Sequence, residues 1–339
     1  MKAVLALAPY PETAPSTRFR LVELQGALEE LGVRMDIHPF VSAAAYRELK
    51  RGGAFLRRGA TLVAAFEALR GILDRAMAYD VVVVQRGIGL MFDGSLLDAL
   101  VRRGTPLLYD FDDAVFLRQE GGRPWLEAVR RPEETTARFC RAADVVLAGN
   151  AYLADFARDA RGERPDRVRV LPSVVNTRRY VPGEGAGGGL PTLGWVGSDS
   201  TVPYLETLAP ALRRLAERRP HRLVVVAGDR RPDMPGVPYD FVPWKDRDEV
   251  SHFQELDVGL YPLPDTPWSQ GKCGFKAIQY LACGVPCVAS PTGVLHTTLS
   301  NTSPKKLFWA LRLVMTRGAF LPVNSSDNFA MSSPPFRRS

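Results

Sequence analysis

Short runs of hydrophobic residues recur along the first half of the chain and predict buried β-strands. The runs occupy residues 4–8, 80–84, 105–109, 144–150 and 168–172. Because they are continuous and rich in valine, both faces of each strand are expected to be covered, as in a parallel sheet. Helically spaced apolar residues lie at 19–31 and 152–158. Strands that alternate with helices predict βαβ units and a doubly wound sheet.

A glycine-rich stretch, residues 182–190, interrupts this alternation and has the composition of a flexible linker. Its Gly183, Gly185 and Gly188 also match the dinucleotide-binding pattern G-x-G-x-x-G. That pattern indicates a pyrophosphate site only where it leaves a strand and opens a helix. Here a loop precedes it and a strand follows it, so we interpret the stretch as a linker.

The alternation resumes after the linker and predicts a second domain of the same kind. Its expected strands are 192–196, 223–228, 241–244, 257–262 and 285–290, and its expected helices are 202–218, 248–256 and 275–282. We therefore predict an α/β protein with two Rossmann-like domains, residues 1–181 and 191–295, that face each other across a cleft. Ligands of such domains bind at the carboxyl ends of the strands.

The composition changes again near His296. Of the 37 acidic residues, only Asp327 lies beyond Asp265, and serine, threonine, asparagine and proline are frequent from Thr297 onward. Such a composition is typical of chain that does not pack a core of its own. We expect residues 296–339 to form an atypical, partly disordered tail, so that the second domain is truncated.

Charge and cysteine content narrow the partners and the compartment. The net charge of +7 suits a nucleoside diphosphate, an acidic lipid surface or nucleic acid, but no motif supports nucleic acid. The spacing of the four cysteines fits neither a disulfide scaffold nor a zinc site, so we expect no metal. The apolar start of the chain is better explained by a strand than by a signal peptide. A cytoplasmic location is expected.

The most informative segment is residues 271–290, where a glycine-flanked turn leads into the predicted helix 275–282. Lys272 and Lys276 lie four residues apart and therefore on one helical face. Two ammonium groups and the backbone N–H groups of a helix N-terminus together suit a pyrophosphate. On these grounds alone, a solvated basic first turn explains the pattern equally well.

This segment resembles the signature of glycosyltransferase family 4, whose members are retaining enzymes with the GT-B fold. The matching residues are Lys276, Tyr280, Ala282, Gly284, Pro286, Ala289 and Ser290. Residues 14–20, 171–180 and 194–198 are similar to further family segments, and the resemblance covers residues 1–294. It implies transfer of a sugar from a nucleoside diphosphate sugar, a substrate and not a cofactor. The acceptor would be a hydroxyl of a saccharide or of a lipid-linked molecule.

The donor side departs from the family at its paired glutamates, which fall on Gly271 and Gln279. Gln279 can still hydrogen-bond the hydroxyl groups of the donor ribose, whereas Gly271 has no side chain to contact the sugar. We therefore expect sugar selection to differ or activity to be impaired. The expected donor-binding residues are Gly197, Ser198, Trp244, Gly271 and Gln279.

A second departure concerns the phosphates. The basic pair that commonly follows the glycine loop of the family is replaced by Ser198 and Pro203. We therefore assign neutralisation of the phosphate charge to Lys272 and Lys276, helped by Ser198 and backbone N–H groups. Both lysines are expected to act in catalysis because they stabilise the leaving diphosphate.

Three carboxylates follow the predicted strand 105–109 and should face the cleft. They belong to Asp110, Asp112 and Asp113, and groups this close perturb one another's pKa, as is frequent at functional sites. We expect Asp112 and Asp113 to bind acceptor or sugar hydroxyls during catalysis. A metal-binding D-x-D motif and an exposed turn at the strand end are the rival interpretations.

The acceptor is expected to lie against the N-terminal domain. Gln85 and Arg86, which follow the strand 80–84, are candidate residues of the cleft. Arg18 and Arg20 could hold an anionic acceptor, although a solvated helix start explains them almost as well. Residues 47–75 interleave basic and apolar side chains, which favours either contact with an anionic membrane or packing on the domain itself.

Three functions remain open from the sequence. The first is a glycosyltransferase in the cytoplasm, with peripheral contact to the inner membrane face as one form of it. The second is a relative that binds nucleotide or saccharide without catalysis, which Gly271 and the atypical tail favour. The third is a nucleotide-sugar epimerase, against which the absence of a clear acid–base histidine pattern counts.

Overall fold

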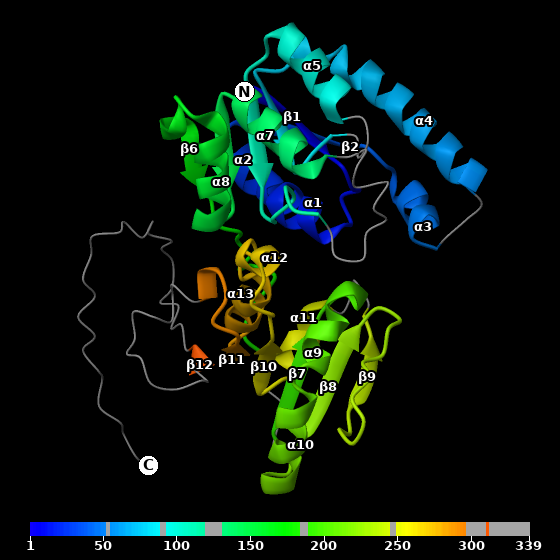
Figure 1. Ribbon diagram of the computed structural model, residues 1–339, viewed down its shortest axis with the longest axis vertical. Coiled ribbons are helices and arrows are strands. Elements are labelled where there is room, and N and C mark those ends of the chain that lie inside the picture. The colour runs from blue at the N-terminus through cyan, green and yellow to red at the C-terminus, as the bar shows by residue number, and fades with distance from the viewer. Residues whose placement is uncertain are drawn as a thin grey trace.

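The computed structural model describes residues 1–51, 55–88, 93–118, 131–183, 189–244, 249–295 and 310–311. These residues form two α/β domains, which lie one above the other in Figure 1. Each domain is built on its own sheet, and helices pack against both sheets. The predicted fold class, two doubly wound parallel-sheet domains, is confirmed.

The N-terminal sheet is entirely parallel, with the strand order β2-β1-β3-β4-β5-β6. Its strands are β1 (Lys2–Ala8), β2 (Val33–Pro39), β3 (Val81–Gln85), β4 (Leu107–Phe111), β5 (Val145–Ala148) and β6 (Val168–Val170). The order reverses between β1 and β3. Doubly wound sheets bind ligands at such a reversal, because the loops that follow the two strands leave in opposite directions.

Short helices connect these strands. They are α1 (Pro15–Arg20), η1 (Val22–Leu24), α2 (Gln25–Glu30), α3 (Ala43–Arg51), α4 (Phe55–Leu73), η2 (Ala76–Ala78), α5 (Asp93–Arg103), α7 (Pro132–Ala142), α8 (Ala151–Arg161) and η3 (Pro165–Arg167). The aromatic centre of the core is a stack in which Tyr109 lies between Phe111 and Phe139, with ring centroids 5.2 and 4.9 Å apart. All three side chains are buried, so β4 is fixed against α7.

The C-terminal sheet has the order β12-β11-β10-β7-β8-β9 and is parallel except for β12. Its strands are β7 (Thr192–Val196), β8 (Arg222–Ala227), β9 (Asp240–Pro243), β10 (Val258–Tyr261), β11 (Cys287–Ala289) and β12 (Ala310–Leu311). Its helices are η4 (Asp199–Thr201), α9 (Val202–Glu206), α10 (Ala209–Arg218), α11 (Glu249–Gln254), α12 (Pro267–Gln270) and α13 (Phe275–Ala282). The order reverses between β7 and β10.

Helix α13 carries the lysine segment and is fixed to the C-terminal sheet by Tyr280. The Tyr280 ring is fully buried, and its hydroxyl accepts a hydrogen bond of 2.9 Å from the Val196 N–H at the end of β7. Gly259 on β10 leaves room for the ring, because a Cβ at this position would lie 2.4 Å from it. The tyrosine of the signature is therefore a structural residue that sets where α13 begins.

Two elements differ from the sequence prediction. Strand β2 was not predicted, although Val33, Met35 and Ile37 alternate with polar residues, as in a half-buried edge strand. The helix predicted at 19–31 is broken at Leu21, which leaves the helical region (φ −127°) and is buried beside β1. The predicted tail, residues 296–339, lies outside the described residues except for β12.

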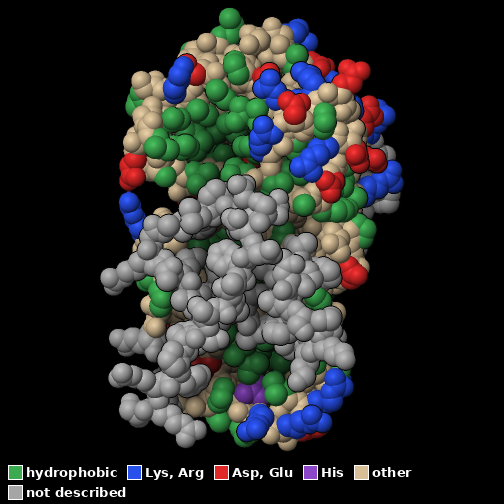
Figure 2. All heavy atoms as spheres, turned by 90° about the vertical axis from the view of Figure 1, so that its left-hand side faces the viewer, with side chains coloured by type: hydrophobic (Ala, Val, Ile, Leu, Met, Phe, Trp, Pro, Cys, Tyr) green, Lys and Arg blue, Asp and Glu red, His purple; other side chains and the backbone are tan. Residues whose placement is uncertain are grey.

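Strand β6 forms the far edge of the N-terminal sheet. Its Val170 and the following Leu171 are 44% and 42% exposed. Figure 2 shows hydrophobic side chains gathered on the N-terminal domain on the side of β6 and α8. This face is separate from the carboxyl ends of the strands, where the two domains meet.

Candidate functional site

The strand reversals of both domains carry residues that the sequence predicted for the site. Gln85 and Arg86 follow β3 in the N-terminal domain, and Gly197 and Ser198 follow β7 in the C-terminal domain. Contacts between the domains involve the loops at these carboxyl ends and the segment that leads into α13. The site is therefore built at the interface between the two domains.

Two glycines allow the lysine segment to press against the N-terminal domain. A Cβ on Gly271 would lie 2.6 Å from the Ala114 Cβ and 2.8 Å from the Ala114 N. A Cβ on Gly149 would lie 2.4 Å from the Cys273 sulfur. No side chain fits at either glycine without moving the domains apart. Gly271, which was expected at the donor sugar, instead lies against the loop after β4.

Asn150 fixes the same contact through hydrogen bonds. Its side-chain oxygen accepts from the Leu153 N–H at 2.9 Å and so caps α8. Its amide nitrogen donates to the backbone carbonyls of Gln270 and Lys272 at 3.1 and 3.2 Å. One buried side chain thus caps a helix of the N-terminal domain and holds the lysine segment of the other domain. Sequence analysis did not single out Asn150.

Lys272 is neutralised across the domain interface. Its ammonium donates to Asp113 at 3.0 Å, and the Arg86 guanidinium lies 3.5 Å from the same carboxylate. Arg86 also donates to Asp112 at 2.6 Å. We call these four side chains the Lys272 cluster. Because it contains two cations and two carboxylates, it carries no net charge.

Arg86 is held in an uncommon conformation to make these bonds. Its φ is +62°, in the left-handed region that side chains other than glycine rarely adopt. The Tyr109 hydroxyl donates to the Arg86 carbonyl at 3.0 Å. Burial alone would raise the pKa of Asp112, but the charge and hydrogen bond of Arg86 outweigh it and lower that pKa. Asp112 is therefore ionised at neutral pH. Gln85 is buried and donates to Asp112 at 3.4 Å.

Lys276 has a different environment from Lys272. It is half-buried, and its ammonium lies 5.3 Å from the centre of the Phe253 ring on α11, within the range of a cation–π contact. Among the described residues, no carboxylate lies within ion-pair distance of this ammonium. Burial lowers the pKa of Lys276 to about 8, and Arg18 lowers it further while Glu249 opposes both. At neutral pH the ammonium is charged but only partly compensated.

A second cluster lies beside Lys276 and is centred on Glu249, at the start of α11. Its carboxylate accepts from Arg18 of α1 at 2.5 Å and from Gln279 of α13 at 3.2 Å. Arg179 lies 3.5 Å away, and the Gln279 amide also donates to the Tyr180 hydroxyl at 2.8 Å. We call these five residues the Glu249 cluster. Sequence analysis missed Glu249, and its partner Arg18 is 231 positions away in the chain.

These contacts redefine three predicted residues. Arg18 is bonded to Glu249, and Arg20 is buried against Asp110, with its Nε donating at 3.0 Å. Both guanidinium groups therefore bond carboxylates of the protein and do not face open space. Gln279, predicted at the donor ribose, has no exposed surface, and its side-chain oxygen finds no partner among the described residues.

Three further donor candidates line the C-terminal domain. Ser198 is exposed at the carboxyl end of β7, and its backbone N–H and side chain bond the Thr201 hydroxyl in a capping box. Gly197 precedes it, and a Cβ there would lie 2.3 Å from the Trp195 ring. Trp244 is half-buried after β9, and its N–H donates to the Ala227 carbonyl. Only Ser198 presents an open polar group.

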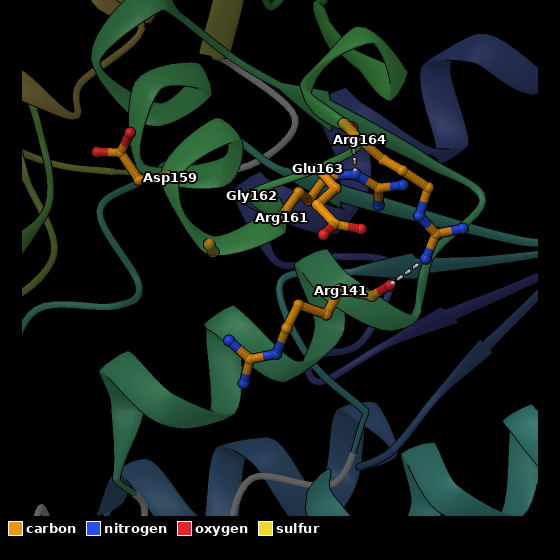
Figure 3. Close-up of a pocket in the computed structure, with 7 residues that line it drawn as sticks. Arg141, Asp159, Arg161, Gly162, Glu163 and Arg164 are labelled. Atoms are coloured by element: carbon orange, nitrogen blue, oxygen red, sulfur yellow. Dashed lines mark hydrogen bonds between the residues drawn. The ribbon is translucent and has the colours of Figure 1, made fainter.

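A separate hollow of about 360 Å³ lies where α7 and α8 end in the N-terminal domain (Figure 3). Arg161 donates to the carbonyls of Cys140 and Ala143, and Arg164 donates to that of Arg141 at 3.4 Å. Figure 3 shows that the side chains around the hollow diverge. Its arginines bond the last carbonyls of α7, so we assign them a structural role.

Neither a metal site nor a membrane span is found in the described part of the chain. No three potential ligands from His, Cys, Asp and Glu lie together there. No helix among these residues is long and apolar enough to cross a bilayer. The carboxylates of the D-x-D sequence, Asp110 and Asp112, each bond an arginine.

Comparison with known proteins rests on structure. No protein-family model matches the chain, and no curated protein matches its sequence. Among solved structures, sucrose-phosphate synthase from Thermosynechococcus elongatus is similar with a TM-score of 0.63 and 17% identity, over 88% of this chain and 84% of that one. An α-glucosyltransferase in complex with UDP is similar with a TM-score of 0.59 and 11% identity, over 88% and 86%.

A trehalose 6-phosphate synthase from Burkholderia multivorans is similar with a TM-score of 0.55 and 15% identity, over 88% of this chain and 86% of that one. These proteins are GT-B glycosyltransferases. The chain has the GT-B fold. Identities this low establish the fold and leave the activity to be argued from the site.

Proposed function

We propose that this GT-B chain is a glycosyltransferase that takes its sugar from a nucleoside diphosphate sugar. The observation that carries the proposal is the ammonium of Lys276. It sits near the N-terminal end of α13, half-buried between two domains, and no carboxylate of the described residues pairs with it. A partly desolvated cation without a counter-ion is unfavourable for folding and is typical of an anion-binding site.

The proposed chemistry follows from the charge of the leaving group. Negative charge develops on the diphosphate as the bond to the sugar breaks, and a fixed cation in a dry cleft stabilises that charge. The N–H groups at the start of α13 add the positive end of a helix dipole. Lys272 joins Lys276 at the diphosphate once Asp113 releases it. The freed Asp113, with Asp112, is then placed to bind a hydroxyl of the sugar or acceptor.

The finer assignment rests on the family resemblance. Membership in glycosyltransferase family 4, retention of the anomeric configuration and a saccharide or lipid-linked acceptor are parts of the proposal. One similar structure holds UDP, and another α-glucosyltransferase structure holds UDP-glucose with DNA containing an abasic site. UDP-sugars are therefore the first donors to test.

A cytoplasmic location and peripheral contact with an anionic membrane also belong to the proposal. Helices α3 and α4 cover most of the basic and apolar stretch at residues 47–75. Co-sedimentation with vesicles of phosphatidylcholine and phosphatidylglycerol, compared with phosphatidylcholine alone, tests the contact. Equal recovery with both vesicle types would remove it from the account.

A second candidate function is nucleotide binding without transfer. The Lys272 cluster is already neutral, and Ala114 fills the space beside Gly271, where the family has a glutamate. Both observations favour a chain that has lost part of its sugar site. An epimerase is the third candidate: a putative UDP-N-acetylglucosamine 2-epimerase from Listeria monocytogenes shares the fold, with a TM-score of 0.51 and 12% identity.

One experiment separates the three functions. The protein is incubated with a panel of UDP- and GDP-sugars, with and without saccharide acceptors, and the products are followed by chromatography. Release of the nucleoside diphosphate with transfer or hydrolysis supports the transferase. Binding without turnover supports the second candidate, and an epimerised donor supports the third. A chain that neither binds nor converts any donor would overturn the proposal.

A further inference from the structure

Glu249 is a single buried carboxylate that joins three separate segments of the chain. It is 2% exposed and lies at the start of α11 in the C-terminal domain. Arg18 reaches it from α1 of the N-terminal domain, Arg179 from the segment between the domains, and Gln279 from α13. Few surface ion pairs add stability, but a buried carboxylate with three donors fixes the groups around it.

The same carboxylate faces the lysine of the proposed donor site. Lys276 and Gln279 are three residues apart on α13 and share a helical face, and so do Glu249 and Phe253 on α11. The Lys276 ammonium lies 5.3 Å from the Phe253 ring centre, and the Gln279 amide donates to Glu249 at 3.2 Å. These two contacts place the face of α13 that carries Lys276 over the face of α11 that carries Glu249.

The N-terminal domain approaches at the same point. The ring of Phe19 lies 4.0 Å, between centroids, from that of Phe275, the residue before Lys276. The guanidinium carbon of Arg18 lies 4.4 Å from the Phe19 ring centre. Arg18 therefore brings a positive charge close to Lys276 while it neutralises Glu249.

We propose that Glu249 is a positioning residue for the donor site: it holds α1 and α13 together and sets the charge of the Lys276 ammonium. The proposal rests on the proposed function, because it concerns the lysine assigned to the diphosphate. It predicts that the two members of one ion pair act on Lys276 in opposite senses. Glu249 favours the charged ammonium and Arg18 disfavours it, as expected from the signs of their charges.

All charged groups packed around Lys276 enter this balance. Glu249 comes from α11 and Arg18 from α1, while Arg179 is compensated by Glu249 and by Glu23, 3.6 Å away. Lys272, which precedes α13, is compensated by Asp113. The sign of each substitution therefore depends mainly on Glu249 and Arg18.

The test is a pH titration of the lysine side chains of the full chain by NMR, with Glu249→Gln, Arg18→Gln and the double variant. The chain has seven lysines, so the Cε signals are few, and Lys276→Arg assigns the signal of interest. We expect a midpoint near 8 in the wild type, a lower midpoint in Glu249→Gln and a higher one in Arg18→Gln. The double variant should return toward the wild-type value. Asp98→Asn, which removes an exposed partner of Arg138, should leave the midpoint unchanged.

A purely structural role predicts a different result. Both single variants break the same ion pair, so loss of packing alone would expose Lys276 and move its midpoint upward in both. Shifts in the same direction, or no shift, overturn the proposal. Thermal unfolding of each variant shows that the domains remain folded during the titration.

A second arm measures UDP affinity between pH 7 and pH 9.5 with the same proteins. In the wild type the Kd for UDP at pH 9 should be about tenfold that at pH 7, because about a tenth of Lys276 stays charged at pH 9. The onset of this loss should move with the NMR midpoint in each variant. Opposite NMR shifts without any UDP binding would support the charge balance and contradict the proposed function. UDP binding whose pH dependence ignores the NMR midpoint would overturn the role of Glu249 at the donor site.

Discussion

The two lysines at the start of α13 lie four residues apart and have opposite electrostatic environments. Lys272 bonds Asp113 across the domain interface, inside a cluster without net charge. Lys276 lies on the Phe253 ring, and burial lowers its pKa to about 8. The difference separates two tasks that the sequence assigned jointly: Lys272 holds the domains together in the structure described, and Lys276 is the group prepared for an anion.

The comparison also explains why the site is unfavourable for folding without its ligand. A buried cation that lacks a counter-ion forfeits hydration, and the loss appears as a lowered pKa. The ordinary pKa of lysine is 10.5, so between about 8 and 10.5 the unfolded chain binds the proton that the folded protein has released. The Lys276 contribution therefore makes the fold more stable as pH rises through this window. A bound diphosphate would supply the missing charge at neutral pH.

The largest expected effect is on catalysis by Lys276→Met. Removal of a cation that stabilises developing charge typically lowers kcat by on the order of 100-fold or more. We expect kcat/KM for the active UDP- or GDP-sugar to fall by at least this factor, measured by release of the nucleoside diphosphate. Lys276→Arg keeps the charge and should retain much of the activity. Full activity in Lys276→Met would show that this ammonium does not contact the donor.

The same variant should gain stability. Methionine fills the same space without a desolvated charge, so at pH 7 the free energy of unfolding should rise by roughly 1–3 kcal/mol. Urea unfolding at pH 7 and pH 10 measures this. The gain should shrink at pH 10, where most of the wild-type Lys276 is neutral in the folded protein. A variant that is less stable than the wild type at both pH values would contradict the account.

A methyl group on Gly271 tests how closely the two domains meet. The Cβ of Gly271→Ala would overlap the Ala114 backbone, and overpacking of this kind costs about 1–3 kcal/mol or opens the interface. We expect a lower Tm and a larger radius of gyration in X-ray scattering. Gly26→Ala is the matched control, because its Cβ meets nothing within 4 Å and alanine favours helix α2. An unchanged Tm in Gly271→Ala would mean that the interface is looser than the contacts indicate.

Release of Lys272 should produce a smaller effect of opposite sign. Asp113→Asn removes the carboxylate that competes with a diphosphate, so we expect UDP to bind about 3- to 10-fold more tightly in calorimetry. Turnover should fall in the same variant if Asp113 binds a sugar or acceptor hydroxyl. Weaker UDP binding in Asp113→Asn would contradict the view that Asp113 and the diphosphate compete for Lys272.

The elements that the sequence predicted well are those whose signal is local. Valine-rich runs identified β3 and β5 because a strand covered on both faces needs apolar residues at every position. The helix 275–282 was predicted with the bounds that α13 has in the structure. Strand β2 was missed because its alternating residues, Val33 to Ile37, lie within a short and partly polar edge strand. Its signal was present and could have been found by period.

The candidate site was less predictable because its residues find their partners far along the chain. Arg20 bonds Asp110, and Arg18 bonds Glu249, at separations of 90 and 231 residues. A local pattern shows that an arginine is present and does not show whether a carboxylate will neutralise it. Gly271 illustrates the same point, since its lack of a side chain becomes meaningful only when Ala114 is seen against it.

The central claim is that the charge of Lys276 between the two domains binds a diphosphate. The most direct test is calorimetric titration of the wild type and Lys276→Met with UDP and with uridine at pH 7. The account predicts that the wild type binds UDP at least about 100-fold more tightly than uridine, from charge-assisted hydrogen bonds worth about 3 kcal/mol, and that Lys276→Met loses most of this preference. Equal affinity of the wild type for UDP and uridine would contradict it.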